Sequence, residues 1–168
     1  AKAAIRLAAS IDGPVYIRMG RASVPEVYSE GFELELGRAY VLREGTDVTI
    51  AACGIEVAEA LTAAEVLAER GIDAEVIDVP TIKPLDSSTL LASAGKTGRM
   101  VTVEEHSIYG GLGSAVAELL GEAEPTRMMR IGVPDVFGLS GDPSELVEYF
   151  ELDSNSIARR VESWLAGL

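Results

Sequence analysis

Short apolar runs alternate with segments of helical periodicity along most of this 168-residue chain, and this alternation constrains the fold more than any other feature. Four runs are apolar, largely β-branched or flanked by turn residues, as buried strands are: 47–53, 74–80, 99–105 and 126–132. Strands that alternate with helices build a mostly parallel sheet whose faces are covered by those helices. The pattern therefore predicts an α/β fold.

The intervening segments carry the expected helix signals. In residues 55–70 apolar side chains recur every three or four positions, and Gly71 follows where a C-cap glycine belongs. Asp86 and Asp142 are N-cap residues, the second followed by Pro143 at the first helical position. We expect helices over 55–70, from Asp86 to Ala94 with Gly95 as its end, over 114–120, after Asp142, and over 154–165.

The first 36 residues do not follow this alternation. The segment AKAAIRLAAS reads as the end of a helix and PVYIRMG (14–20) as a strand, whereas residues 21–36 have no clear period. A helix–strand pair followed by a linker predicts that residues 1–20 are the tail of a preceding domain. Residues 21–36 would be the linker and 37–168 the main domain.

Charge and cysteine content exclude several classes of function. The net charge of −13, from 27 acidic and 14 basic residues, repels phosphate backbones and anionic lipid, so we expect neither nucleic-acid nor membrane partners. No apolar run approaches the roughly 20 residues of a membrane span, and the N-terminus lacks the layout of a signal peptide. Cys53 is the only cysteine, which excludes an internal disulfide and favours a reducing, cytoplasmic setting.

Two constellations could carry chemistry on the residues alone. GGLG (110–113) lies between a strand and a helix, as phosphate-binding loops do, but Glu104 and Glu105 precede it, so we interpret it as a tight turn. Cys53 and His106 follow or end two strands and could form a nucleophile–base pair. Against this, a lone cysteine at a strand end is more often a small buried hydrophobe.

Two further patterns concern ions. Arg18 and Arg21 bracket the end of the 14–20 run and could hold a phosphate or carboxylate, or could pair with the nearby glutamates. One histidine and one cysteine leave only scattered carboxylates, so we expect no metal site.

Five segments of the chain resemble the C-terminal part of transketolases, above all the C-terminal subunit of split transketolases. They are GPVYIRMGR (13–21), DVTIAACGIEVAEAL (47–61), DVPTIKPLD (78–86), VTVEEHSIYGGLGSAVAELL (101–120) and RIGVPDVFGLSGDPSELVEYFEL (130–152). The resemblance runs through essentially the whole chain in the family's order. Looser versions occur in 1-deoxyxylulose-5-phosphate synthase and in the beta subunits of 2-oxo acid dehydrogenases.

The resemblance implies a three-layer α/β/α domain with a mostly parallel five-stranded sheet and one antiparallel edge strand, supplied by residues 38–42. It also implies that residues 1–20 end the middle, pyrimidine-binding domain. The complete enzyme would transfer a two-carbon ketol unit between sugar phosphates, with thiamine diphosphate and Mg²⁺ bound outside this chain. This chain alone would bind neither and would not be catalytic.

For site residues, the resemblance implies that Arg21, with Arg18 as second choice, binds the substrate's phosphate. It implies no catalytic residue in this domain and leaves His106 as a candidate at a subunit interface or behind the active site. The expected partners are an N-terminal transketolase section and a second copy in a homodimer. The alternatives are another thiamine-diphosphate enzyme of the same superfamily, a Cys53–His106 hydrolase, or a pure interaction module.

Overall fold

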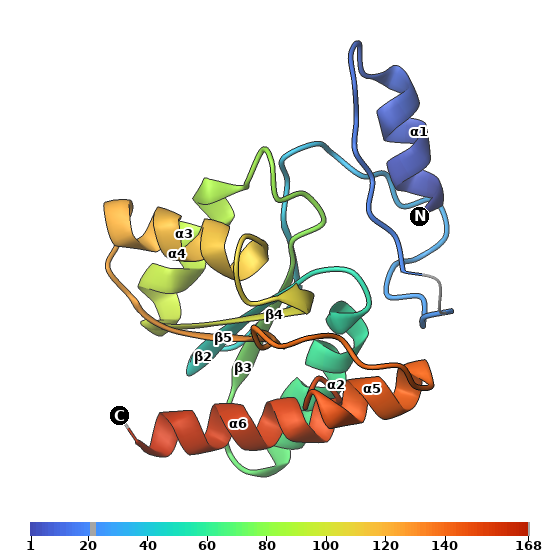
Figure 1. Ribbon diagram of the computed structural model, residues 1–168. Helices are drawn as coiled ribbons and strands as arrows, with labels where there is room; N and C mark the ends of the chain where they lie inside the picture. The colour runs from blue at the N-terminus through green and yellow to red at the C-terminus, as the bar shows by residue number, and fades with distance from the viewer. Residues whose placement is uncertain (21–22, 168) are drawn as a thin grey trace.

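A five-stranded sheet forms the middle of the domain. A computed structural model describes residues 1–20 and 23–167 (Figure 1). The strands are β1 (Tyr40–Arg43), β2 (Val48–Ala52), β3 (Ala74–Asp78), β4 (Arg99–Ser107) and β5 (Arg127–Val133). Their order is β1-β3-β2-β4-β5, with β1 antiparallel to β3 and the other neighbours parallel. This confirms the predicted sheet with its antiparallel edge strand.

Helices cover both faces of the sheet, which completes the three predicted layers (Figure 1). On one face lie α2 (Glu56–Glu69) and α6 (Ser154–Ala166), which pack against each other. On the other lie α3 (Ser87–Thr97) and α4 (Leu112–Ala123). The short helix α5 (Pro143–Tyr149) is capped by Asp142 Oδ1, which accepts a hydrogen bond from Ser144 N at 3.1 Å.

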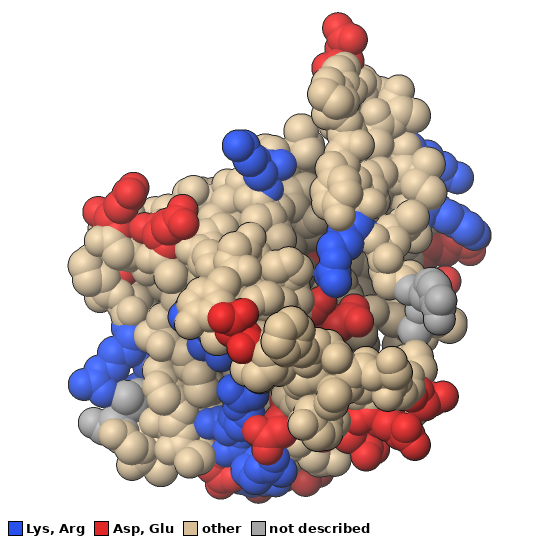
Figure 2. All heavy atoms as spheres, in the orientation of Figure 1, with Lys and Arg blue, Asp and Glu red and all other residues tan. Residues whose placement is uncertain are grey.

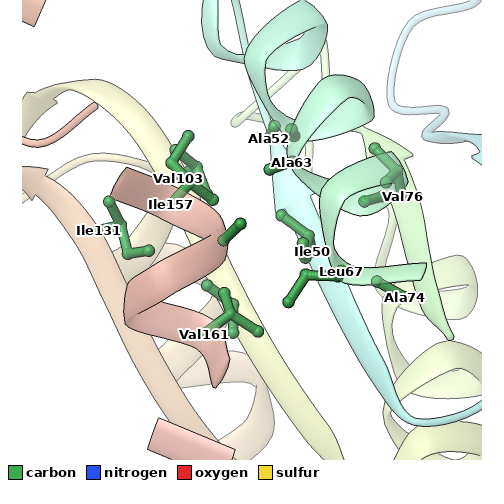
Figure 3. Packing of buried hydrophobic residues seen from close by; sticks show 14 of the residues in the cluster. Ile50, Ala52, Ala63, Leu67, Ala74, Val76, Val103, Ile131, Ile157 and Val161 are labelled. Atoms are coloured by element: carbon green, nitrogen blue, oxygen red, sulfur yellow. The ribbon is translucent and has the colours of Figure 1, made fainter. Parts of the chain in front are cut away.

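The central strand β2 is buried along its whole length, and its alternate side chains enter two separate hydrophobic clusters. Ile50 faces the cluster under α2 and α6, where Ile157 and Val161 of α6 lie over Val103 and Ile131 (Figure 3). Ala51 faces the cluster under α3 and α4. A strand buried on both faces is typical of a parallel sheet between helix layers.

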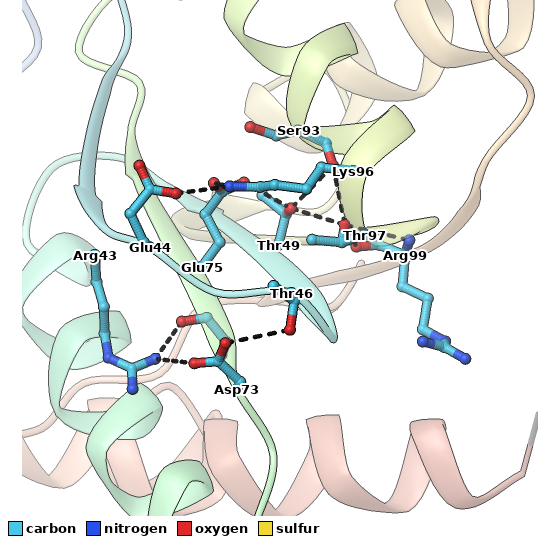
Figure 4. Close-up of polar contacts among 11 residues, drawn as sticks. Arg43, Glu44, Thr46, Thr49, Asp73, Glu75, Ser93, Lys96, Thr97 and Arg99 are labelled. Carbon is cyan, nitrogen blue, oxygen red and sulfur yellow. Dashed lines mark hydrogen bonds and ion pairs between the residues drawn. The ribbon is translucent and has the colours of Figure 1, made fainter.

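A polar network fastens the amino ends of β2 and β3 to α3 (Figure 4). The Glu75 side chain is 1% exposed and forms an ion pair with Lys96, which also lies 2.8 Å from Glu44. Thr49 Oγ1 donates a hydrogen bond to Glu75 Oε1 at 3.0 Å. The buried carboxylate therefore has both a cation and a hydroxyl as partners, as a buried charge requires.

Several predicted boundaries are wrong by a few residues. Helix α3 runs through Gly95 to Thr97, because Gly98 (φ 65°), not Gly95, adopts the left-handed conformation that ends it. Helix α4 begins at Leu112 instead of Ser114, and β4 extends two residues beyond 105. The earlier start of α4 follows from the side chain of Glu104, described below, and the longer β4 pairs Ser107 with Val133 of β5.

The N-terminal segment differs from the prediction in one element. The helix α1 (Lys2–Ser10) is present and none of its residues is buried. Residues 14–20, however, form no strand, because no described strand lies beside them to supply backbone partners. Within residues 1–20 and 23–167, no helix combines the length and apolar character needed to span a membrane.

Acidic side chains gather around α5 on the face shown in Figure 2, and the arginines of α6 lie close to them. Arg159 Nη2 is 2.8 Å from Glu151 Oε1. This pair is exposed, so we expect it to contribute little to stability.

Candidate functional site

The carboxyl ends of β2 and β4 lie side by side at one edge of the sheet, because these strands are parallel neighbours. Cys53 and the start of α2 follow β2, while Glu104, Glu105 and His106 form the end of β4. In parallel α/β sheets this edge is where ligands bind. The chemical groups singled out from the sequence therefore meet in one region, which we take as the candidate site.

Glu104 fastens the end of β4 to the beginning of α4. Its Oε2 accepts a hydrogen bond from Leu112 N and its Oε1 accepts one from Gly113 N, each at 2.7 Å. The side chain is 2% exposed. A carboxylate at this position satisfies two of the four free amides of the helix and is favoured by the helix dipole.

The contacts of Glu104 show whether the GGLG turn can bind phosphate and why it contains glycine. The anion-binding end of α4 already holds a carboxylate of the same chain, so it is not a phosphate cradle. A Cβ added to Gly111 would lie 2.0 Å from Glu104 Oε2, so the turn needs glycine there to let the carboxylate approach. The interpretation of GGLG as a close backbone turn thus agrees with the geometry.

His106 lies beside Glu104 but does not form a hydrogen bond with it. Its Nδ1 is 2.7 Å from Ser107 O, and 3.9 Å from Glu104 Oε2. Because a carbonyl oxygen can only accept, Nδ1 is the donor of this hydrogen bond. The side chain is 40% exposed, so its role at an interface or behind the active site stays a prediction.

Cys53 is not an activated nucleophile. Burial, with the charges of Glu104 and Asp78, raises the pKa of its thiol to about 12, so the thiol stays protonated at neutral pH. Among the hydrogen bonds of the described residues, none joins Cys53 Sγ to His106. Both observations argue against a Cys53–His106 hydrolase.

Glu56 is a buried acid that the sequence analysis did not single out. It is the first residue of α2, is 0% exposed, and neither of its carboxyl oxygens has a hydrogen-bond partner in the described part of the chain. Burial, followed by the charges of Glu59, Glu105 and Asp153, raises its pKa from 4.5 to about 8. The carboxyl is therefore largely protonated at neutral pH.

The structure describes only one of the two candidate arginines, Arg18. Arg18 Nη2 donates a hydrogen bond to Glu105 O at 2.9 Å, which holds the N-terminal segment against the end of β4. Arg21 lies outside the described residues. Arg18 therefore lies at the carboxyl end of β4, while the phosphate-binding roles of Arg21 and Arg18 stay predictions.

A second contact at this edge was missed. Tyr28 Oη donates a hydrogen bond to Asp78 Oδ2 at 2.6 Å, and Asp78 is the last residue of β3 and 6% exposed. Residues 23–36 have no helix or strand, yet this bond ties them to the domain. The only signal in the sequence was an acidic residue at the end of an apolar run, which does not reveal its partner 50 positions away.

No cluster of three or more His, Cys, Asp or Glu side chains in residues 1–20 and 23–167 is suited to a metal ion. Two of the carboxyl groups at this edge are unsuited to a metal, because Glu104 is used by backbone amides and Glu56 is buried and protonated. The edge therefore offers guanidinium and histidine groups more than metal ligands.

Residues 37–157 match the family described as Transketolase, C-terminal domain. The chain belongs to this family. It is 54% identical over 148 residues to 6-deoxy-6-sulfo-D-fructose transketolase subunit SqwH of Clostridium sp. (strain MSTE9), covering 88% of this chain and 46% of that protein. It is 43% identical over 156 residues to a subunit of the apulose-4-phosphate transketolase of Phocaeicola vulgatus, covering 92% of this chain and 50% of that protein.

A solved structure gives the same result for the fold. The "Split gene transketolase, inactive beta4 tetramer" superposes with a TM-score of 0.94 at 49% identity, over 98% of this chain and 54% of that one. The chain, which consists of the C-terminal domain and the segment before it, spans about half the length of these relatives.

Glu104→Gln should destabilise the transketolase C-terminal domain by about 1.5–3 kcal/mol. The amide nitrogen cannot accept a hydrogen bond, so one amide of α4 loses its partner and the helix end loses its counter-charge. Urea unfolding followed by circular dichroism would measure the change. Glu105→Gln is the matched control, since Glu105 is exposed and should change stability by no more than about 0.5 kcal/mol. Equal effects of the two substitutions would contradict the assigned cap.

Glu56→Gln should change the pH dependence of stability. When a carboxyl has a raised pKa in the folded state, the unfolded chain releases its proton at a lower pH than the folded chain does, so stability falls between the two pKa values. The wild type should therefore lose stability relative to Glu56→Gln as the pH rises from 4.5 through about 8. Unfolding measured at several pH values would show this. Glu65→Gln on the exposed side of α2 is the control and should leave the profile unchanged; a flat difference for Glu56→Gln would refute the buried, protonated carboxyl.

Proposed function

We propose that this chain is the C-terminal section of a thiamine-diphosphate-dependent transketolase, which transfers a two-carbon ketol unit between sugar derivatives. The match of residues 37–157 to the transketolase C-terminal domain supports this most directly. The relatives are named as transketolase subunits, and the chain spans about half of each. The proposed partners are therefore an N-terminal transketolase section or subunit and a second copy in a homodimer.

The residues of this chain do not fit thiamine diphosphate. The helix N-terminus at the candidate edge is filled by the Glu104 carboxylate, and Glu105, the next residue of β4, adds a second carboxylate nearby. A diphosphate placed there would meet negative charge instead of free amides. We therefore propose that the cofactor and its Mg²⁺ bind elsewhere in the complete enzyme and that this chain supplies no catalytic residue.

The proposed task of this chain is to bind the anionic end of the substrate and to close the edge of the active site. Arg21 is the first choice for that contact and Arg18 the second. Arg18 lies at the carboxyl end of β4, so residues 18–20, which we call the arginine segment and which directly precede Arg21, reach the candidate site. A guanidinium binds phosphate through two parallel hydrogen bonds, which makes it suited to this role.

The names of the relatives suggest two kinds of anionic end group. One is named for a sugar phosphate and another for a sulfonated fructose. Both groups present several anionic oxygens that a guanidinium can bind, so the arginine segment alone does not choose between them. We propose sugar phosphates as the main substrates, with a sulfonated sugar as the second candidate on the strength of the 54% identity to the sulfofructose enzyme.

The complete enzyme should transfer a two-carbon unit from a ketose phosphate to ribose 5-phosphate only when thiamine diphosphate and Mg²⁺ are added. The test combines the full subunit containing this chain with its N-terminal section and measures the new ketose by mass spectrometry. The 168-residue chain alone serves as the control and should give no turnover. Turnover without thiamine diphosphate, or by the chain alone, would refute the proposal, and parallel assays with a sulfonated ketose would separate the two substrate candidates.

Arg21→Ala in the complete enzyme should lower kcat/KM for phosphorylated acceptors by roughly 10- to 150-fold, because a charge-assisted contact worth about 1.5–3 kcal/mol is lost. Arg21→Lys should recover only part of this loss, since a point charge replaces a planar fork. A neutral acceptor such as glycolaldehyde should be used almost as well as by the wild type. Equal losses for both acceptors would show that Arg21 is structural, and Arg18→Ala would then be the next test.

A further inference from the structure

We propose that Tyr28 and Asp78 are positioning residues for the arginine segment, residues 18–20, which directly precede Arg21: their hydrogen bond holds this segment across the carboxyl edge of the sheet. The inference rests on the proposed function, because it assigns a task to the segment that would bind the substrate's anionic group. It adds two residues to which neither the family match nor the relatives give a role.

The upstream end of the connection lies against β4 and α2. Arg18 Nη2 donates to Glu105 O at 2.9 Å, so the arginine is already in contact with the end of β4. A Cβ built on Gly20 would lie 3.3 Å from Ile55 Cγ2, so the backbone there packs on the residue before α2. The arginine segment therefore lies beside the ends of the two central strands.

The downstream end is held by an aromatic cluster at the end of β3. The rings of Tyr28 and Phe32 stack with centroids 3.7 Å apart, and Tyr40 of β1 meets both edge-on at 5.9 and 5.0 Å. Tyr40 Oη also accepts a hydrogen bond from Glu35 N at 2.9 Å. The hydroxyl of Tyr28 then reaches Asp78 Oδ2 at 2.6 Å.

The bond between Tyr28 and Asp78 ties the residues after the arginine segment to a buried acid. Asp78 is 6% exposed, and a hydrogen bond to a buried carboxylate is stronger than one between neutral groups. Burial, together with the neighbouring Asp78, raises the pKa of the Tyr28 hydroxyl, so it remains a donor over the physiological range. Removing the hydroxyl would leave a buried carboxylate without that donor.

Holding the segment in place before the substrate arrives lowers the conformational entropy that is lost on binding. Residues 23–36 have no helix or strand, so side-chain attachments take the place of a backbone ladder in restricting them. A guanidinium that is held in place before the substrate arrives loses less freedom on binding than one on a loose segment. Loosening the attachment at Tyr28 should therefore weaken the binding of anionic substrates without touching the reacting atoms.

Tyr28→Phe in the complete enzyme should raise KM for ribose 5-phosphate roughly tenfold while changing kcat little, because only binding is weakened. KM for glycolaldehyde, which lacks the phosphate, should stay within about twofold of the wild type. Hydrogen exchange of the amides in residues 23–36 should become faster, which reports the loosened segment without any activity assay. Tyr149→Phe is the matched control, since this tyrosine is 66% exposed on α5 and should change none of these values.

The outcomes separate this inference from the proposed function. If Arg21→Ala or Arg18→Ala is selective for phosphorylated acceptors but Tyr28→Phe is not, the positioning role is refuted and the arginine site stands. If neither arginine is selective, the arginine site itself fails. Tyr28→Phe combined with Asp78→Asn should lose no more than Tyr28→Phe alone, because both substitutions break the same bond; additive losses would overturn the proposed pair.

Discussion

The burial of β2 on both of its faces is the constraint on which the rest of the structure depends. All five residues of Val48–Ala52 are buried, so neither face of the sheet can be left to water and a helix layer is required on each side. Parallel neighbours on both sides then bring the ends of β2, β3 and β4 to one edge. That edge is where the turn after β2, the turn before α4 and the N-terminal segment come together.

Polar groups at this edge are arranged to bind and hold rather than to react. The carboxylate of Glu104 is fully used by two amides, the thiol of Cys53 is kept protonated, and Glu56 is buried as a neutral acid. The side chain of His106 and the segment that begins at Arg18 remain accessible to a ligand at this edge. These properties agree with the proposed role, in which the rest of the enzyme supplies the chemistry and this chain shapes the entrance for the substrate.

The fold could be predicted from the sequence because its signals are local. Apolar runs gave the four main strands, helical spacing gave α2 and α6, and Asp86 and Asp142 gave two helix starts. The contacts that define the edge could not be predicted, because they join distant residues: Tyr28 meets Asp78 over 50 positions, and Arg18 meets Glu105 over 87. The segment 14–20 was misread for a related reason, since a strand-like composition does not supply a neighbouring strand.

The cap formed by Glu104 has a consequence for the order of folding. The carboxylate and the amides it binds are only eight and nine residues apart, so β4, the glycine turn and the start of α4 can form together without waiting for distant segments to meet. The contacts of the N-terminal segment, by contrast, close very long loops. We expect the β4–α4 unit to belong to the folding nucleus and the arginine segment to dock last, which would let a nascent chain assemble its core before the contacts at the carboxyl edge of the sheet form.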